Sequence, residues 1–184
     1  MGAYLLLVVY RGFVLRGEDK TSQEVAKIHA TKLMLNDVLG KNLPQMPSNP
    51  DSSIAGVDAN RNGIRDDVEL AIFKEYPNSA KTRAVLLQYA LALQMEMVQT
   101  VVNKGTVIAV AQEKSQAAGC ISEVTPRTDL QRFITATRQL TDFIKKIQIN
   151  TSTRDQAQIA FYKNLDSYSD LKETCDIELS TLPN

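Results

Sequence analysis

The sequence predicts an all-α fold, an antiparallel bundle of five or six helices with one extended loop. Apolar residues recur at helical spacing over most of the chain after residue 20, and helix-capping residues precede several of these stretches. Between them, residues 41–57 hold three prolines together with Asn, Ser and Gly, which excludes a regular helix there. A chain of 184 residues is long enough for one domain with its own core, and we expect a single helical domain over residues 21–184.

Residues 1–20 begin with an apolar run, "MGAYLLLVVY", and leave three interpretations open. The run is similar to the core of an export signal, but it lacks a positive leader, and no A-x-A cleavage site precedes "GEDKTSQE". The alternatives are a short strand or helix packed on the domain and a flexible tail. We favour a degraded export signal. The run is too short to cross a bilayer, so we expect no transmembrane span.

The first helix of the domain is expected over about residues 22–39. Thr21 and Glu24 form a capping-box signal, and apolar residues then recur at helical spacing until Gly40. The single histidine, His29, falls within this helix. We expect it to be exposed or partly packed, because no acidic or thiol partner stands near it in the sequence. The proline-rich residues 41–57 then form an extended connector.

The remaining helices follow one another with short turns. Val68, Ile72 and Tyr76 fall at steps of four and predict a short helix that Pro77 ends. A much longer pattern begins near Ser79, and its two adjacent apolar stripes predict a helix surrounded by neighbours at the centre of the bundle. These stripes consist of Leu86, Ala90, Leu93, Met97 and Val101, and of Leu87, Leu91, Met95, Val98 and Val102.

Three more segments complete the predicted bundle. After Gly105, the stretch "TVIAVAQEKSQAAG" continues helical towards Cys120. Thr125 and Pro126 are predicted to start an amphipathic helix that reaches Ile147. Ser152 with Asp155 is the capping signal of a last helix, whose apolar face carries Phe161, Leu165 and Tyr168.

Composition excludes several classes of function. The 21 basic and 21 acidic residues give no net charge that would attract nucleic acid, and the chain has no Trp and few aromatic residues on which bases could stack. We therefore expect no nucleic-acid partner. The H-E-x-x-H and G-x-S-x-G motifs are absent, and no residue is predicted to be catalytic.

Cys120 and Cys175 are too few and too far apart for a zinc site, and no C-x-x-C motif is present. Both cysteines stand at predicted helix ends, so a disulfide between them is the preferred interpretation. Two buried free thiols are the alternative. A disulfide favours a location outside the cytosol, as a periplasmic or secreted protein.

The segment "DANRNGIRDDVE", residues 58–69, is the one place where the sequence specifies a chemistry. Calcium prefers about six to eight oxygen ligands from carboxylates, amides and main-chain carbonyls. Counted from Asp58, oxygen-bearing side chains fall at the first, third, fifth, ninth and twelfth positions, with glycine sixth. This spacing predicts a Ca²⁺ site made by Asp58, Asn60, Asn62, the carbonyl of Ile64, Asp66 and Glu69. The alternative is a polar turn followed by acids that favour a helix N-terminus.

The segment resembles the EF-hand-like calcium loops that occur in thrombospondin type 3 repeats and in dockerins, and singly in many exported bacterial proteins. The resemblance covers about fourteen residues, matched to the motif. Two features depart from the EF-hand pattern: the eighth position is Arg65, and the connector replaces an entering helix. Because Arg61 and Arg65 reduce the local negative charge, we expect a calcium affinity of about 10⁻⁵ to 10⁻³ M.

These observations predict a calcium-stabilised, non-enzymatic protein outside the cytoplasm, a binding or accessory module for a protein or small ligand. In this interpretation calcium fixes the connector, which has no other evident source of order. The alternative is a hydrolytic or lytic enzyme that uses acids of the loop or of the segment "TSTRDQ". A deep pocket lined by convergent polar groups would favour the enzyme. A calcium-responsive switch is a third possibility, which the missing entering helix disfavours.

Overall fold

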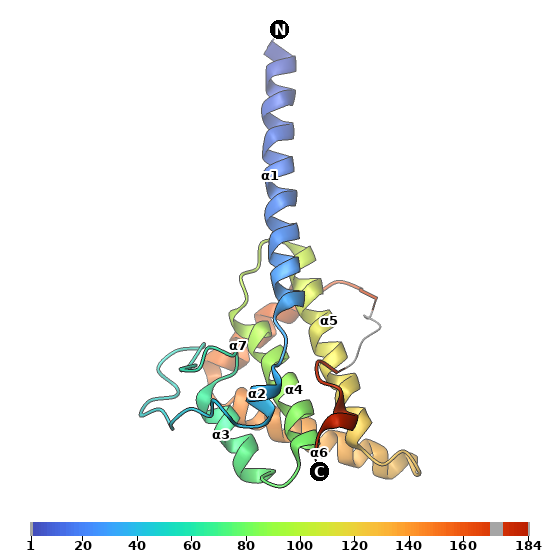
Figure 1. The fold of residues 1–184 in the computed structure, drawn as a ribbon. Helices are drawn as coiled ribbons and strands as arrows, with labels where there is room; N and C mark the ends of the chain where they lie inside the picture. The colour runs from blue at the N-terminus through green and yellow to red at the C-terminus, as the bar shows by residue number, and fades with distance from the viewer. Residues whose placement is uncertain (1, 170–174, 184) are drawn as a thin grey trace.

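The computed structural model describes residues 2–169 and 175–183, and for residues 2–10 and 12–16 it describes the backbone alone. Within these residues the chain forms helices and no β-strand, which confirms the all-α class (Figure 1). The helices are α1 (Gly2–Ala30), α2 (Leu35–Val38), α3 (Asp66–Glu75), α4 (Ala80–Val98), α5 (Lys104–Ile121), α6 (Leu130–Gln148) and α7 (Ser152–Lys163), with short 3₁₀ segments η1 (Ser122–Val124) and η2 (Leu179–Thr181).

Helix α4 is the centre of the core. It contacts α2, α3, α5, α6 and α7, and most of its residues are buried. Ser79 caps its first turn, because the Ser79 side chain accepts a hydrogen bond from the Thr82 amide. The predicted central helix is therefore confirmed up to Val98. Val101 and Val102 were expected to continue its stripes, but they lie beyond its end and are exposed, because the next helix begins at the N-cap Asn103.

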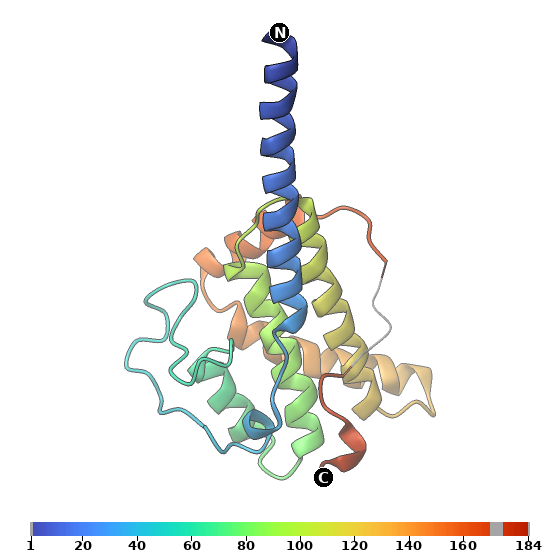
Figure 2. The same ribbon diagram turned by 45° about the horizontal axis from the view of Figure 1, so that its top comes forward.

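Helix α1 is longer at its start and shorter at its end than the sequence predicts. It is continuous from Gly2 to Ala30, and in both views its first half projects away from the body (Figures 1 and 2). Thr21 was expected to begin a helix, but it lies inside α1, and its hydroxyl donates to the Gly17 carbonyl at 2.9 Å. The predicted helix over residues 22–39 is instead split: residues 31–34 separate α1 from α2.

The last turn of α1 and Lys32, which follows it, contact Glu113 of α5 through polar side chains. His29 Nδ1 lies 2.6 Å from Glu113 Oε1, and Lys32 Nζ lies 2.7 Å from Glu113 Oε2. The sequence had offered His29 no partner, because Glu113 comes from a distant part of the chain. These contacts hold the end of α1 against α5.

Helices α3, α6 and α7 form where the sequence predicts helices, but some of their predicted limits are wrong. Val68 and Ile72 of α3 are fully buried, as predicted. Helix α6 begins after Asp129, whose side chain accepts from the Arg132 amide at 2.8 Å, so Thr125 and Pro126 are not its cap. An aspartate that reaches the free amides of the first turn is the stronger cap.

Helix α7 is capped by Thr151, whose side chain accepts from the Arg154 amide, and not by Ser152. It ends at Lys163, so Leu165 and Tyr168, which were expected on its apolar face, lie beyond it.

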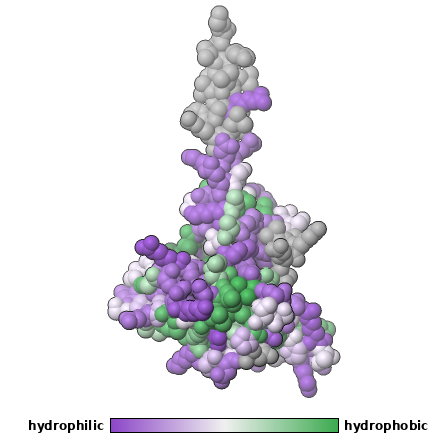
Figure 3. Space-filling model, viewed as in Figure 1, coloured by the Kyte–Doolittle hydropathy of each residue, from purple (hydrophilic) through white to green (hydrophobic). Residues whose placement is uncertain are grey.

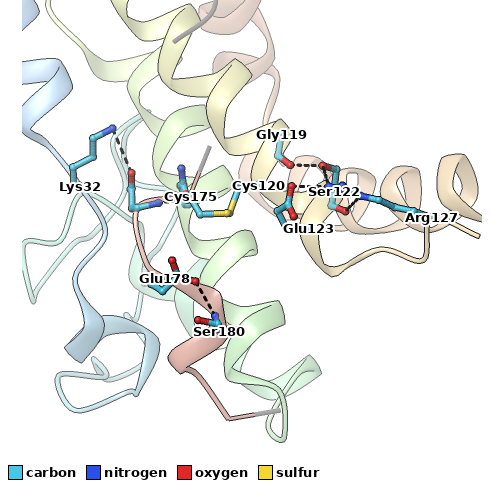
Figure 4. Close-up of a disulfide and its surroundings, with 11 residues drawn as sticks. Lys32, Gly119, Cys120, Ser122, Glu123, Arg127, Cys175, Glu178 and Ser180 are labelled. Atoms are coloured by element: carbon cyan, nitrogen blue, oxygen red, sulfur yellow. Dashed lines mark hydrogen bonds and ion pairs between the residues drawn. A yellow bond between two sulfur atoms is a disulfide. The ribbon is translucent and has the colours of Figure 1, made fainter. Parts of the chain in front are cut away.

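A disulfide joins Cys120, in the last turn of α5, to Cys175 near the C-terminus (Figure 4). The predicted pairing is confirmed, and neither cysteine is free. Beside it, Lys32 Nζ lies 3.3 Å from the carboxylate of Asp176, which also accepts from the Leu33 amide. The C-terminal segment is thus fixed to both α5 and the end of α1.

The surface in Figure 3 is mostly hydrophilic, with a hydrophobic area in the middle of the body. In the part of the chain that the structure describes, no helix has both the length and the apolar character needed to cross a membrane.

Candidate metal centre in the loop 58–69

The loop 58–69 connects residues 41–57 to α3 and turns sharply at two residues. Gly63 has φ +84°, and Arg61 has φ +59°, both in the left-handed region. A Cβ atom at Gly63 would lie 2.6 Å from Leu91 Cδ1 of α4, so space as well as backbone conformation favours glycine there. The predicted role of Gly63 in a tight turn agrees with this geometry.

The carboxylate of Asp58 accepts hydrogen bonds from main-chain amides on the other side of the loop. One of its oxygens accepts a hydrogen bond from the Asn62 amide at 3.1 Å, and the other accepts from the Gly63 amide at 2.9 Å. Asp66 Oδ1 accepts from the Ala59 amide at 2.9 Å. Because the loop's own N–H groups bind these oxygens, the carboxylates of Asp58 and Asp66 are drawn towards the inside of the loop.

The two asparagines continue this arrangement. Asn62 Oδ1 accepts from the Ile64 amide at 2.9 Å, and Asn60 Nδ2 donates to Glu69 Oε2 at 3.0 Å. The side chain of Ile64 is fully buried in the core, so Ile64 can offer a metal ion only its main-chain carbonyl. The structure therefore brings the predicted ligand residues together around one short loop and the first turn of α3.

Glu69 is a carboxylate in an unfavourable electrostatic environment. Its side chain is fully buried, and Oε1 has no hydrogen-bond partner among the residues that the structure describes. Asn62 Nδ2 is also buried without a partner; it lies near enough to Glu69 to favour the charged form, but not in hydrogen-bond geometry. Burial raises the pKa of Glu69 to about 7, against the opposing effect of the Asn60 amide.

The surrounding acids add to this effect. The charges of Asp37 and Asp66 also raise the pKa of Glu69. The pKa of Asp66 is itself raised, mainly by burial and also by the charge of the nearby Asp58. Asp37 comes from α2 and accepts a hydrogen bond from the Met34 amide. Negative charge therefore accumulates around Glu69, and no basic side chain in the described part of the chain forms an ion pair with it.

The donor set fits a hard cation in its chemistry. All six predicted ligands offer oxygen, and the orphaned Glu69 Oε1 is a buried acceptor without a donor. Among the described residues, no three His, Cys, Asp or Glu side chains lie close enough together to hold a metal ion by themselves. A site here therefore depends on the amide oxygens of Asn60 and Asn62 and on the Ile64 carbonyl as well as on the carboxylates.

Arg65, at the eighth position of the loop, does not reduce the charge of the site as expected. Its side chain is fully buried and forms two hydrogen bonds with Asp67, at 3.0 and 2.5 Å. It also donates to the Gln148 carbonyl, at the end of α6, at 3.0 Å. The positive charge of Arg65 is therefore balanced by Asp67, and the side chain anchors the loop to α6.

The connector 41–57 is ordered by an arginine that sequence analysis did not single out. Arg154 of α7 is fully buried, and its guanidinium reaches Asp51 at 2.5 Å. It also donates to three main-chain carbonyls of the connector, those of Pro50, Ser53 and Ile54. The connector therefore has a source of order that was not evident in the sequence. No local pattern reveals this role, because Arg154 and the connector are far apart in the sequence.

The chain was compared with protein-family models, with curated proteins and with solved structures, and none of the three comparisons gave a match.

Proposed function

We propose that the loop 58–69 binds one Ca²⁺ ion and that this ion stabilises the start of α3 against the body of the protein. The observation that carries the proposal is Glu69, a fully buried carboxylate with one oxygen that finds no hydrogen-bond partner in the described part of the chain. Leaving a buried charged acceptor unpaired is costly, and a cation beside it removes that cost.

Each ligand has a distinct role. Asp58 and the amide oxygens of Asn60 and Asn62 supply one side of the coordination, and Glu69 supplies the other with both oxygens. The Ile64 carbonyl and Asp66, directly or through a water molecule, complete the set. Binding requires the Asn60 amide, which now donates N–H to Glu69, to turn its oxygen towards the ion.

Calcium then offsets the cluster of negative charge around Glu69. Because Arg65 is paired with Asp67, only Arg61 weakens the attraction of the loop for a cation. We therefore expect an affinity at the tighter end of the range inferred from the sequence, with a Kd of about 10⁻⁵ M.

The cellular role that fits these features is a non-enzymatic binding or accessory module in the periplasm or outside the cell. The disulfide supports this location, because disulfides persist in oxidising compartments. The short connections between α4, α5, α6 and α7, and the contacts of α4 with the other three, support an antiparallel bundle as its scaffold. Calcium has a structural role in this proposal.

The loop acids offer little support to the alternative, a hydrolytic or lytic enzyme. Asp66 and Glu69 are buried, so a substrate has no access to them. In the segment "TSTRDQ", Arg154 is fully buried and holds the connector. We therefore retain the binding module as the proposed function.

The test is thermal unfolding of the full chain in EGTA and then with rising calcium. Saturable stabilisation is expected, amounting to about 2.7 kcal/mol when free calcium reaches a hundred times the Kd. Asp58→Ala and Glu69→Gln should each abolish the calcium-dependent shift of the midpoint. Asp142→Ala, which removes an exposed carboxylate of α6, is the matched control and should keep the full shift.

The readout is the shift caused by calcium and not the midpoint itself, because Asp58 also accepts two hydrogen bonds within the loop. Isothermal titration calorimetry should give one calcium per chain. A wild-type midpoint that is the same in EGTA and in saturating calcium refutes the proposal, and the segment is then only a well-capped polar turn.

A further inference from the structure

Glu96, in the last turn of α4, is a buried carboxylate whose hydrogen-bonding needs are met by three side chains. Its oxygens accept from the Tyr162 hydroxyl at 2.8 Å and from Gln158 Nε2 at 2.7 Å, and Lys114 Nζ lies 2.9 Å away. The C-terminal end of a helix disfavours a carboxylate, and the contacts with these three side chains offset that unfavourable position. Burial and the neighbouring Glu96 raise the pKa of Tyr162, which therefore stays protonated and donates.

A hollow of about 200 Å³ opens beside this cluster, between α5, α7 and the residues that follow α7. Its wall is partly apolar, formed by Ala111, Ala118 and Leu165, and two half-exposed tyrosines, Tyr162 and Tyr168, also line it. The segment after α7 is held in place by Gln112, whose amide donates to the Ser169 carbonyl at 2.7 Å. The hollow is therefore formed by positioned elements of the fold.

Two hydrogen-bond donors on α5 line this hollow with capacity to spare. The ammonium group of Lys114 has three N–H donors, and its contacts with described residues are to Glu96 and Tyr162. The hydroxyl of Ser115, one residue further along α5, makes no hydrogen bond with any residue that the structure describes. The carboxylate of Glu96, by contrast, is not accessible to a further donor, because it is buried and already accepts from three side chains.

We propose that this hollow binds a small uncharged molecule that consists of one ring and a carbonyl or hydroxyl oxygen. The oxygen accepts hydrogen bonds from Lys114 and Ser115, and the ring packs against Tyr162 and the apolar wall. Cavities of about 150 Å³ accommodate a benzene ring, so a hollow of about 200 Å³ suits a ring with one small substituent.

The charge balance of the cluster selects an uncharged ligand. Glu96 and Lys114 neutralise each other within 2.9 Å, so the wall of the hollow carries no net charge. A carboxylate ligand would compete with Glu96 for Lys114 and leave one negative charge in excess. A neutral acceptor uses the remaining N–H of Lys114 without disturbing the ion pair.

This inference deepens the binding role proposed above and rests on it only for the assumption that the protein is a binding module. The probe is benzamide, with benzoate as its charged counterpart, titrated into the full ¹⁵N-labelled chain and followed by amide chemical shifts. Benzamide is expected to shift amides of α5 and α7 saturably and to bind more tightly than benzoate.

Variants test the named donors. Lys114→Met and Ser115→Ala should each weaken benzamide binding, Lys114→Met by about tenfold, because each removes a hydrogen-bond donor. Lys146→Met changes an exposed lysine of α6 and should bind like the wild type. Should Lys114→Met fail to fold, Ser115→Ala decides the question alone, because the Ser115 hydroxyl makes no hydrogen bond with the described residues that its removal would break.

The proposal is overturned if benzamide leaves the amides of α5 and α7 unchanged, if benzoate binds more tightly, or if Ser115→Ala binds like the wild type. The titration is performed both in EGTA and in calcium. Failure of the calcium site appears in the unfolding experiments without benzamide, and failure of the hollow appears in the titration under both conditions, so the two are distinguishable.

Discussion

Replacement of Arg154 by methionine should destabilise the protein more than any surface change of similar size. The guanidinium of Arg154 is fully buried and is the common donor for Asp51 and for the three connector carbonyls of Pro50, Ser53 and Ile54. Methionine fills much of the same volume but donates no hydrogen bond, so these acceptors lose the Arg154 hydrogen bonds together, and Asp51 keeps only its contacts with Asn150 and Arg65 among the described residues.

The expected magnitude follows from the exposure of those acceptors. Removing one partner of a buried ion pair costs about 3–5 kcal/mol, because the other charge stays buried. Asp51 is 43% exposed, so water replaces part of what it loses, and we expect the lower end, about 3 kcal/mol. This is a large share of the stability of an ordinary domain, about 5–15 kcal/mol.

The assay is equilibrium unfolding in urea in the presence of EGTA, with Arg138→Met as the matched control. Arg138 is exposed on α6, and its replacement should change the free energy of unfolding by less than about 0.5 kcal/mol. Limited proteolysis should also show faster cleavage within residues 41–57 for the Arg154 variant. A stability loss for Arg154→Met within about 1 kcal/mol of the control, with no change in cleavage, refutes the view that Arg154 orders the connector.

Three further predictions concern the loop and the disulfide. Burial raises the pKa of Glu69 from 4.5 to about 7, so folding favours its protonated form. In EGTA, the free energy of unfolding of the wild type should therefore fall as the pH rises from about 4.5 to about 7, and more steeply than that of Glu69→Gln; equal pH dependence contradicts this. Replacing both Cys120 and Cys175 by alanine, which opens a loop of 55 residues, should cost about 4 kcal/mol in urea unfolding. Gly63→Ala should cost about 1–2 kcal/mol, because Gly63 has φ +84°, whereas Gly17→Ala, in an open position of α1, should be neutral or slightly stabilising; similar effects of the two changes count against strain at Gly63.

The helices are largely readable from the sequence, because each depends on local periodicity and on capping residues. Val68 and Ile72 mark the buried face of α3, and the wide apolar surface of α4 predicts its central place. The errors fall at the limits of the helices. Several candidate caps compete at the starts, and α4 and α7 end before Val101 and Leu165, which the periodicity had included. Thr21 lies within α1, and Asp129 rather than Thr125 begins α6, since tertiary packing decides which candidate is used.

The sequence predicted which residues form the candidate metal centre, but not how deeply they are buried or which of them lack hydrogen-bond partners. The spacing of Asp58, Asn60, Asn62, Asp66 and Glu69 places their oxygens around one loop, since all of them lie within twelve consecutive residues. Spacing could not indicate that Glu69 would be fully buried with one unpaired oxygen, because that burial comes from the core around α3 and α4.

By itself, the sequence determined the helical class and the position of the oxygen-rich loop, because both depend on local pattern. It favoured a disulfide over two free thiols, and the structure confirms the Cys120–Cys175 pair. Only the tertiary structure decided which charges meet. Arg65 pairs with Asp67 and reaches the end of α6, Arg154 holds a connector about a hundred residues away, and Lys114 balances Glu96 beside the hollow. The physical reason is that buried charges must find opposite partners wherever the fold brings them, and helical periodicity carries no information about charges on another helix.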